Sequence, residues 1–137
     1  MKTINLIFSL WLILLTACSS TPIARDPQHS PETVMITYHV KPGMDVVLQD
    51  ALARAWVIYR KENLVFAQPH TIVQDQSGGG GGIRIIEIFT WVNHAAPEHV
   101  PDSVKQIWAE MQGLCQMPNG QGGLEGGEVV LLAPKNK

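Results

Sequence analysis

The chain has 137 residues, of which 45% are hydrophobic and 16% are charged, and its formal net charge is −2. This length allows one domain, and the apolar fraction excludes a chain that is disordered throughout. The near-neutral charge argues against a broad basic surface for nucleic acid or anionic lipid. Two cysteines are too few for a scaffold held by disulfides. The sequence therefore predicts one small globular domain.

The chain opens with an apolar segment that carries a single charge, Lys2. Its hydrophobic part, residues 4–15, has the length of a signal-peptide core and is too short to span a bilayer comfortably. It runs into the sequence LTAC at residues 15–18, which resembles the lipobox of bacterial lipoproteins. The resemblance implies a signal peptide over residues 1–17, a lipid on the Cys18 thiol and a membrane anchor. An ordinary secretory signal is the alternative.

Lipidation at Cys18 has consequences for the location of the protein and for its other cysteine. Two serines, rather than an aspartate, follow Cys18, and in the Gram-negative sorting pattern this favours the periplasmic side of the outer membrane. Cys115 is then the one remaining thiol, so an intramolecular disulfide is excluded. Residues 18–33 are rich in serine, threonine and proline, and we interpret them as a flexible tether. The folded domain is predicted at residues 34–134.

Six elements are predicted after the tether. β-Branched and aromatic residues indicate strands, and apolar residues spaced three and four apart indicate helices. In chain order we expect a strand at 34–40, a helix at 45–62, strands at 64–75 and 83–92, a helix at 101–114 and a strand at 128–133. Pro69 cannot donate a hydrogen bond to a ladder, so the second strand is expected at a sheet edge or with a bulge.

Both predicted helices carry one continuous apolar stripe. The first stripe consists of Leu48, Leu52, Ala55, Trp56 and Tyr59, and the second consists of Val104, Ile107, Trp108, Met111 and Leu114 with Cys115. Asn63 can cap the C-terminus of the first helix. The order β-α-β-β-α-β predicts a ferredoxin-like α+β fold, with a four-stranded antiparallel sheet and two helices on one face. Right-handed crossovers place the first and third strands at its centre.

The third strand is apolar on both faces, which has a consequence for assembly. One face holds Ile83, Ile85, Glu87, Phe89 and Trp91, and the other holds Arg84, Ile86, Ile88, Thr90 and Val92. Residues 129–132 repeat this two-sided pattern. The helices cover one face of the sheet, and an apolar second face would meet water. A second copy that packs sheet to sheet would cover it, so we predict a homodimer.

A glutamate and a tryptophan on this strand, Glu87-x-x-x-Trp91, are followed by His99 in a loop. Together with the order of elements, this resembles the dimeric α+β barrel superfamily over residues 34–133, in particular its antibiotic-biosynthesis-monooxygenase-like and stress-responsive domains. The resemblance implies a barrel built from two copies. It also implies a monooxygenase-like domain that binds, and in the enzymes oxidises, a small apolar or aromatic molecule without a cofactor. A non-catalytic binding or assembly module of the cell envelope is the alternative.

Glu87 and His99 are the predicted catalytic residues, as acid/base groups. Glu87 stands on an otherwise apolar face, where burial makes a carboxylate a stronger base, and histidine is the usual proton shuttle. The alternative is a structural Glu87 that pairs with Arg84, His39 or a helix residue of a partner. His39 and His70 fall on strands and are predicted to be structural. The predicted ligand-binding residues are Trp91, Phe89, His94 and Tyr38.

No metal and no cofactor are predicted. His94, Glu98 and His99 form a loose group of potential metal ligands, but their spacing matches none of the compact motifs. The five glycines at 78–82 lack the Gly-Lys-Ser/Thr of a phosphate loop and are predicted to form a hairpin tip. Cys115 lies on a helix stripe and is predicted to be a buried, inert thiol.

Overall fold

The computed structural model describes residues 29–75, 82–116 and 122–132. Along the chain run β1 (Glu32–His39), α1 (Asp45–Lys61), β2 (Thr71–Asp75), β3 (Arg84–Trp91), the 3-10 helix η2 (Ala96–His99), α2 (Asp102–Gly113) and β4 (Leu124–Glu128). No helix in these ranges has both the length and the apolar character needed to cross a membrane. The predicted signal peptide, Cys18 and the glycines at 78–81 lie outside the described residues.

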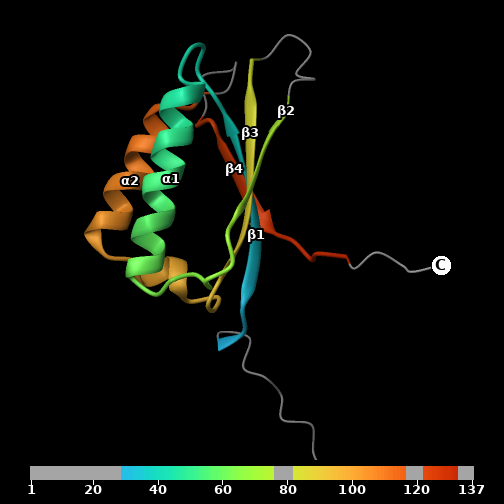
Figure 1. Ribbon diagram of the computed structural model, residues 1–137, viewed down its shortest axis with the longest axis vertical. Coiled ribbons are helices and arrows are strands. Elements are labelled where there is room, and N and C mark those ends of the chain that lie inside the picture. Colours follow the sequence, from blue (N-terminus) through green and yellow to red (C-terminus); the bar gives the residue numbers. More distant parts are fainter. Residues whose placement is uncertain (1–28, 76–81, 117–121, 133–137) are drawn as a thin grey trace, which may run out of the picture.

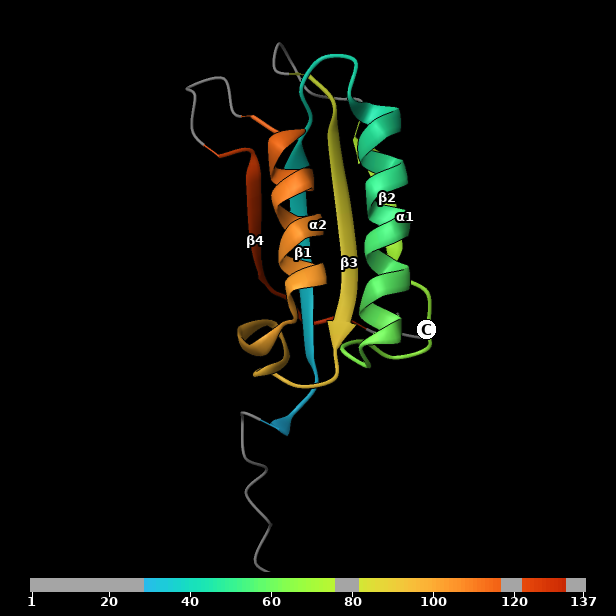
Figure 2. The ribbon, with the colours of Figure 1, turned by 90° about the vertical axis from the view of Figure 1, so that its left-hand side faces the viewer.

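The four strands form one antiparallel sheet in the order β2-β3-β1-β4. Both helices cover the same face of this sheet (Figure 1), and they lie side by side across it (Figure 2). The predicted ferredoxin-like α+β fold is confirmed, with the first and third strands at the centre. These two strands pair over their full length, from Glu32 opposite Trp91 to His39 opposite Arg84.

The helices bury the predicted stripes against the sheet. All five predicted residues of the α1 stripe belong to the core or pack against it, and the same holds for the six of α2. α1 ends where Asn63 adopts the left-handed conformation, with φ of +56°. The Asn63 amide donates to the carbonyl of Arg60 over 3.2 Å, which satisfies one of the free carbonyls of the last turn. The predicted role of Asn63 at this helix end is confirmed.

β2 is shorter than predicted. It begins at Thr71, so Pro69 lies in the segment before the strand and not in the ladder. Proline has no amide hydrogen, and regular pairing therefore starts only after it. Upstream of Pro69, Val65 makes an isolated bridge to Trp91. The predicted position of this strand at the sheet edge is confirmed.

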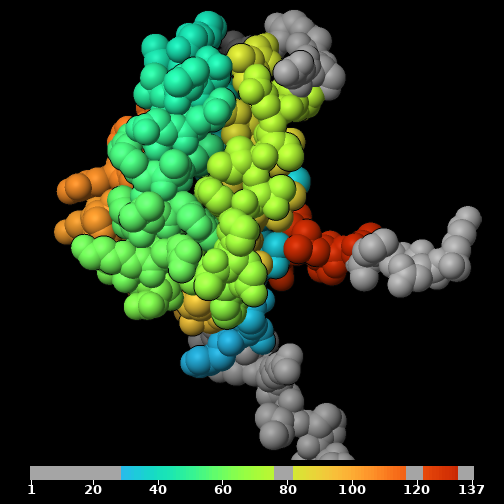
Figure 3. All heavy atoms as spheres, viewed as in Figure 1, coloured from blue at the N-terminus to red at the C-terminus, as the bar shows by residue number. Residues whose placement is uncertain are grey.

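The prediction of the last strand at 128–133 is wrong. β4 comprises residues 124–128 and pairs with β1, from Leu124 opposite Tyr38 to Glu128 opposite Val34. β1 begins at Glu32, which this register places opposite residue 130, so a strand antiparallel to β1 has no partner beyond that residue. The apolar side chains of residues 130–132 are exposed. Figure 3 shows this segment leaving the body of the domain on the side away from the helices.

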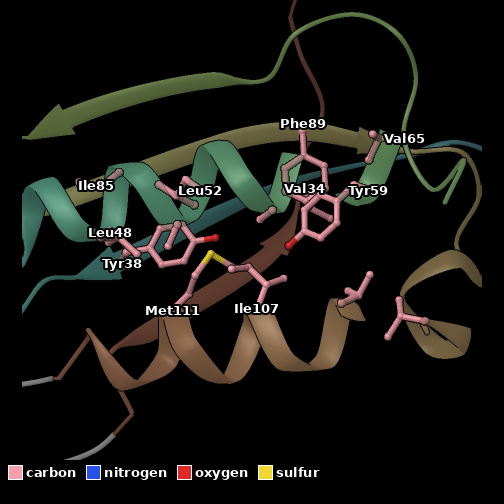
Figure 4. Close-up of a cluster of buried hydrophobic side chains, with 14 of the residues drawn as sticks. Val34, Tyr38, Leu48, Leu52, Tyr59, Val65, Ile85, Phe89, Ile107 and Met111 are labelled. Carbon is pink, nitrogen blue, oxygen red and sulfur yellow. The ribbon is translucent and has the colours of Figure 1, made fainter. Parts of the chain in front are cut away.

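The core lies between the helices and the sheet (Figure 4). Its fully buried side chains include Leu48 and Leu52 of α1, Ile85 of β3 and Met111 of α2. The opposite face of the sheet has an apolar centre in which Met35 and Val73 are exposed and Ile86 and Ile88 are half-buried. We call these four residues the outer face.

Candidate active site

The most unusual feature of the core is a carboxylate. Glu87 on β3 faces the helices and is the one charged residue that is buried in the described part of the chain, with 1% of its side chain exposed. The Tyr38 hydroxyl donates to Glu87 Oε2 over 2.9 Å, and His70 Nδ1 lies 2.5 Å from Glu87 Oε1. Both carboxylate oxygens are therefore hydrogen-bonded, which a buried charge requires.

Strand register brings these three residues together. Ile36 of β1 and Ile72 of β2 stand directly opposite Glu87 on its two sides. Tyr38 lies two residues after Ile36, and His70 lies two residues before Ile72. Residues two apart share a face, so both side chains reach diagonally across to Glu87 from neighbouring chain segments. We call Glu87, Tyr38 and His70 the buried triad.

His70 is held by packing as well as by its hydrogen bond. Its ring stacks on the indole of Trp56, with ring centroids 4.3 Å apart and planes 17° from parallel. Trp56 in turn meets Phe89 edge-on at 6.0 Å. The ring of His70 therefore has a fixed orientation between α1 and β3.

The phenols of the site are neutral over the physiological pH range. Burial raises the pKa of Tyr38 strongly, and the neighbouring Glu87 charge raises it further. Burial also raises the pKa of Tyr59, although the hydrogen bond from Trp108 acts in the opposite direction. Trp108 Nε1 donates to the Tyr59 hydroxyl over 2.5 Å. Tyr38 is thus a neutral donor toward Glu87.

A cavity of about 460 Å³ lies beside the triad, between β1, β4 and α2. Aromatic and apolar side chains dominate its wall, with Glu32 and Gln112 as polar members. The wall consists of Glu32, Val34, Ile36, Tyr38, Tyr59, Trp91, Pro97, Trp108, Met111, Gln112, Leu124, Gly126 and Gly127. In Figure 4 the hydroxyl groups of Tyr38 and Tyr59 point into the same region between the sheet and α2. Tyr38 is therefore both part of the wall and a partner of Glu87.

The predicted ligand-binding residues divide into two groups. Tyr38 and Trp91 line this cavity. Phe89 packs edge-on against Trp91 at 4.7 Å and instead lines a second cavity. His94 is exposed, and its Nδ1 lies 2.9 Å from Oε2 of Glu32, a residue of the cavity wall.

The two residues predicted to be catalytic are not brought together. Glu87 is buried on β3, whereas His99 is exposed at the end of η2. The partners of Glu87 are also not the ones named in the structural alternative, Arg84 and His39. Arg84 pairs with Asp75, and His39 lies 3.3 Å from Glu125.

His70 is the member of the triad that the sequence prediction does not connect with Glu87. It stands outside any strand, next to Pro69, and no spacing in the chain links it to Glu87. The pairing of β2 with β3 creates the contact, and this register is not visible in the residues of either segment. Within the described ranges, no cluster of three or more His, Cys, Asp or Glu is arranged to hold a metal. Cys115 is buried as predicted, and burial raises the pKa of its thiol to about 11.

The comparisons with known proteins concern the fold. No protein-family model matches the chain, and a search of curated proteins gives no match. SnoaB, a cofactor-independent oxygenase from Streptomyces nogalater, is 14% identical at a TM-score of 0.58, over 79% of this chain and 99% of SnoaB. Rv0793 from Mycobacterium tuberculosis is 14% identical at a TM-score of 0.55, over 78% and 100%. Hydroxynitrile lyase from Passiflora edulis is 9% identical at 0.52, over 77% and 99%.

Identities this low establish a shared fold and nothing finer. An oxygenase and a hydroxynitrile lyase catalyse different reactions, so the fold alone does not assign one to this chain. The chain nevertheless spans nearly the whole length of these proteins. It has the ferredoxin-like α+β fold of a group that includes a cofactor-independent oxygenase.

Proposed function

We propose that this domain binds a small apolar or aromatic molecule in the cavity beside α2 and oxidises it with molecular oxygen. The observation that carries the proposal is the placement of Tyr38, whose hydroxyl joins an aromatic cavity wall to a buried carboxylate. A cavity of about 460 Å³ with walls of this kind suits a planar ligand of two or three rings. The shared fold with a cofactor-independent oxygenase supports the same reaction class.

The triad supplies proton removal. A ligand with an acidic C–H or O–H bond places it against the Tyr38 oxygen. The Tyr38 proton passes to Glu87 as the ligand proton passes to Tyr38, which leaves a ligand anion and a protonated Glu87. The anion reduces molecular oxygen: an activated methylene group becomes a carbonyl group, which keeps one oxygen atom, and the other oxygen atom leaves as water. The proton held on Glu87 goes to solvent, and the product water takes one proton from solvent in its place. The net reaction, methylene plus dioxygen to carbonyl plus water, is balanced with dioxygen as the oxidant.

One observation favours a second candidate, a binding module without catalysis. Both oxygens of Glu87 already have a hydrogen-bond partner, which is also how a purely structural carboxylate is stabilised. In that case the cavity binds its ligand but Glu87 removes no proton. Binding and oxygen consumption are therefore measured separately.

Filling the cavity is expected to weaken ligand binding. Gly126 lies in the wall on β4, and a Cβ there would make only ordinary contacts, 3.6 Å from Ile36 Cγ1. We expect Gly126→Leu to weaken binding of 1-naphthol at least about tenfold, because the new side chain occupies ligand space. Quenching of Trp91 and Trp108 fluorescence measures the affinity.

The matched control is Glu125→Leu, the neighbouring residue on β4, whose side chain lies on the opposite face of the sheet. It is expected to leave the affinity within about twofold. Equal binding to both variants would place the ligand outside this cavity. Oxygen uptake with 1,8-dihydroxyanthrone then separates the two candidates: uptake that Glu87→Gln abolishes supports catalysis, and binding without uptake supports the binding module.

We propose that two copies associate through the outer face. Its apolar centre and the exposed apolar residues 130–132 lie on the side of the sheet that the helices leave uncovered. Light scattering of the chain from residue 29 onward is expected to give twice the chain mass. Val73→Glu on this face is expected to give monomers, because burying an unpaired charge in an interface is costly. Val57→Glu on the exposed side of α1 is the control and should leave the dimer intact.

We also propose that Cys18 carries a lipid that anchors the domain on the periplasmic side of the outer membrane. The support is the LTAC sequence at residues 15–18 and the serines after it. Mass spectrometry of the N-terminal peptide tests the proposal, and a diacylglyceryl group on Cys18 is expected. An unmodified Cys18 thiol, or a mature N-terminus at another residue, would contradict it.

A further inference from the structure

The members of the buried triad differ in their access to solvent. Tyr38 has 1% of its surface exposed, and the side chain of Glu87 has 1% exposed. The side chain of His70 has 13% exposed. Of the two residues hydrogen-bonded to Glu87, His70 is thus the more exposed, and imidazole is the group best suited to pass a proton on.

The surroundings of His70 open toward a second cavity of about 550 Å³. Pro69 and Thr71, its two neighbours in the chain, line this cavity, and so does Trp56, on which its ring stacks. Gln68 and Thr71 add polar groups to the wall, and the space is large enough for several water molecules. The triad therefore runs from the ligand cavity at Tyr38 to the partly exposed ring of His70, whose neighbours line a different cavity.

We propose that His70 is the residue through which Glu87 and Tyr38 exchange protons with solvent. This inference rests on the proposed function, in which Glu87 must lose the proton it gains in each turnover. When the carboxyl oxygen facing His70 carries the proton, His70 accepts it in the tautomer whose one ring proton is on Nε2: the Glu87 O–H bond breaks and an Nδ1–H bond forms. The imidazolium then releases its Nε2 proton to water, so that Glu87 is again ionised and accepts from Nδ1–H. Exchange with water returns His70 to the Nε2 tautomer before the next transfer.

The other titratable groups near Tyr38 do not offer this route. Tyr59 and Cys115 interact electrostatically with Tyr38. Both are buried, and burial raises the pKa of each. Neither side chain is hydrogen-bonded to Glu87 or to the Tyr38 hydroxyl, and the Tyr59 hydroxyl is bonded to Trp108 instead. His70 is therefore the expected carrier, and its replacement should slow proton exchange in the triad.

The chain contains only two tyrosines, Tyr38 and Tyr59, which makes the exchange measurable. In an equal mixture of light and heavy water, tyrosine labelled with ¹³C at Cζ gives two lines when its hydroxyl exchanges slowly and one line when exchange is fast. In the full chain, we expect His70→Phe to slow exchange at Tyr38 about 100-fold, the lower end of what a positioned proton-transfer group contributes. Phenylalanine keeps the stacking on Trp56 but carries no proton.

Tyr59 is the internal control, because its hydroxyl is bonded to Trp108 and not to the triad. Slower exchange at Tyr38 with unchanged exchange at Tyr59 supports proton exchange through His70. Unchanged exchange at Tyr38 overturns it. Faster exchange at both tyrosines also overturns it, because a purely structural His70 would loosen the core when replaced. If His70→Phe does not fold, His70→Gln, which keeps a donor for Glu87, decides by the same criteria.

The measurement contains no ligand and no oxygen, so it is independent of turnover. Failure of 1-naphthol to bind would contradict the proposed function and would not affect the exchange result. If the ligand binds and oxygen is consumed, but exchange at Tyr38 is unchanged in His70→Phe, the role of His70 in proton exchange is contradicted and the proposed function is not.

Discussion

Raising the pH from 10 to 12 is expected to lower the free energy of unfolding by roughly 4–5 kcal/mol, in addition to any loss from other groups. The two tyrosines are the cause. In the unfolded chain they ionise near pH 10, whereas burial raises the pKa of Tyr38 and of Tyr59 and keeps both neutral in the folded chain. A raised folded-state pKa gives stability that is complete below pH 10 and is lost as the pH rises above it. Each tyrosine contributes about 1.4 kcal/mol per pH unit there.

Urea unfolding at pH 9, 10, 11 and 12 measures this loss, and single variants assign it. Tyr59→Phe is expected to remove about half of the pH-dependent loss, since one ionisable phenol is gone. Tyr38→Phe should do the same. It should also cost about 1–3 kcal/mol at neutral pH, because the buried Glu87 loses a donor. If the free energy of unfolding falls equally with pH in the unchanged protein, Tyr59→Phe and Tyr38→Phe, the tyrosines ionise in the folded chain and the expectation is wrong.

A single methyl group at Gly123 is expected to destabilise the domain by about 3 kcal/mol or more. Gly123 precedes β4 and lies against the chain after α2. A Cβ there would overlap the amide nitrogen of Gln116 and lie 2.6 Å from the carbonyl carbon and 2.7 Å from the Cβ of Cys115. Two of these atoms belong to the backbone, so rotation of a flexible side chain cannot relieve the overlap. The His39 amide also donates to the Gly123 carbonyl over 2.7 Å, which holds the segment in place.

Thermal or urea unfolding of Gly123→Ala against Gly127→Ala checks this expectation. A Cβ at Gly127 meets nothing within 4 Å, so its alanine variant is expected to be neutral or more stable by about 0.4–1 kcal/mol, through the entropy of the unfolded chain. Similar stabilities of the two variants would mean that the segment before β4 shifts freely away from Cys115.

Local patterns predicted the parts of the fold that local forces determine. The stripes of α1 and α2 and the alternation of β3 follow from periodicity, and the structure has all three. β4 was missed because its sequence, LEGGE, has little strand propensity, whereas residues 129–132 have more. The free edge of β1 determines which segment pairs, and that edge lies beside the glycines. Pairing across the sheet overrode the intrinsic preference.

The residues of the site also fall into two kinds, those that the local sequence indicates and one that only the assembled sheet brings to Glu87. Glu87 stands out in the sequence as a charge among apolar neighbours, and two of the predicted ligand-binding residues, Trp91 and Tyr38, lie on the wall of a cavity. The sequence predicts His99 as the second acid/base residue, because it is near Glu87 in the chain and follows the same strand. The actual neighbour, His70, is 17 residues before Glu87 and reaches it through the register of an edge strand. Contacts of that kind are set by the assembled sheet.

The buried triad also bears on how the chain avoids misfolding. β3 is apolar on both faces, so a slip of one residue against its neighbours would still bury a continuous apolar surface. Glu87 removes that ambiguity. After such a slip its carboxylate would turn to the outer face, while Tyr38 would stay buried without its acceptor. Glu87 thus raises the free energy of the mispaired sheet, so that the native register of β3 against its two neighbouring strands is favoured.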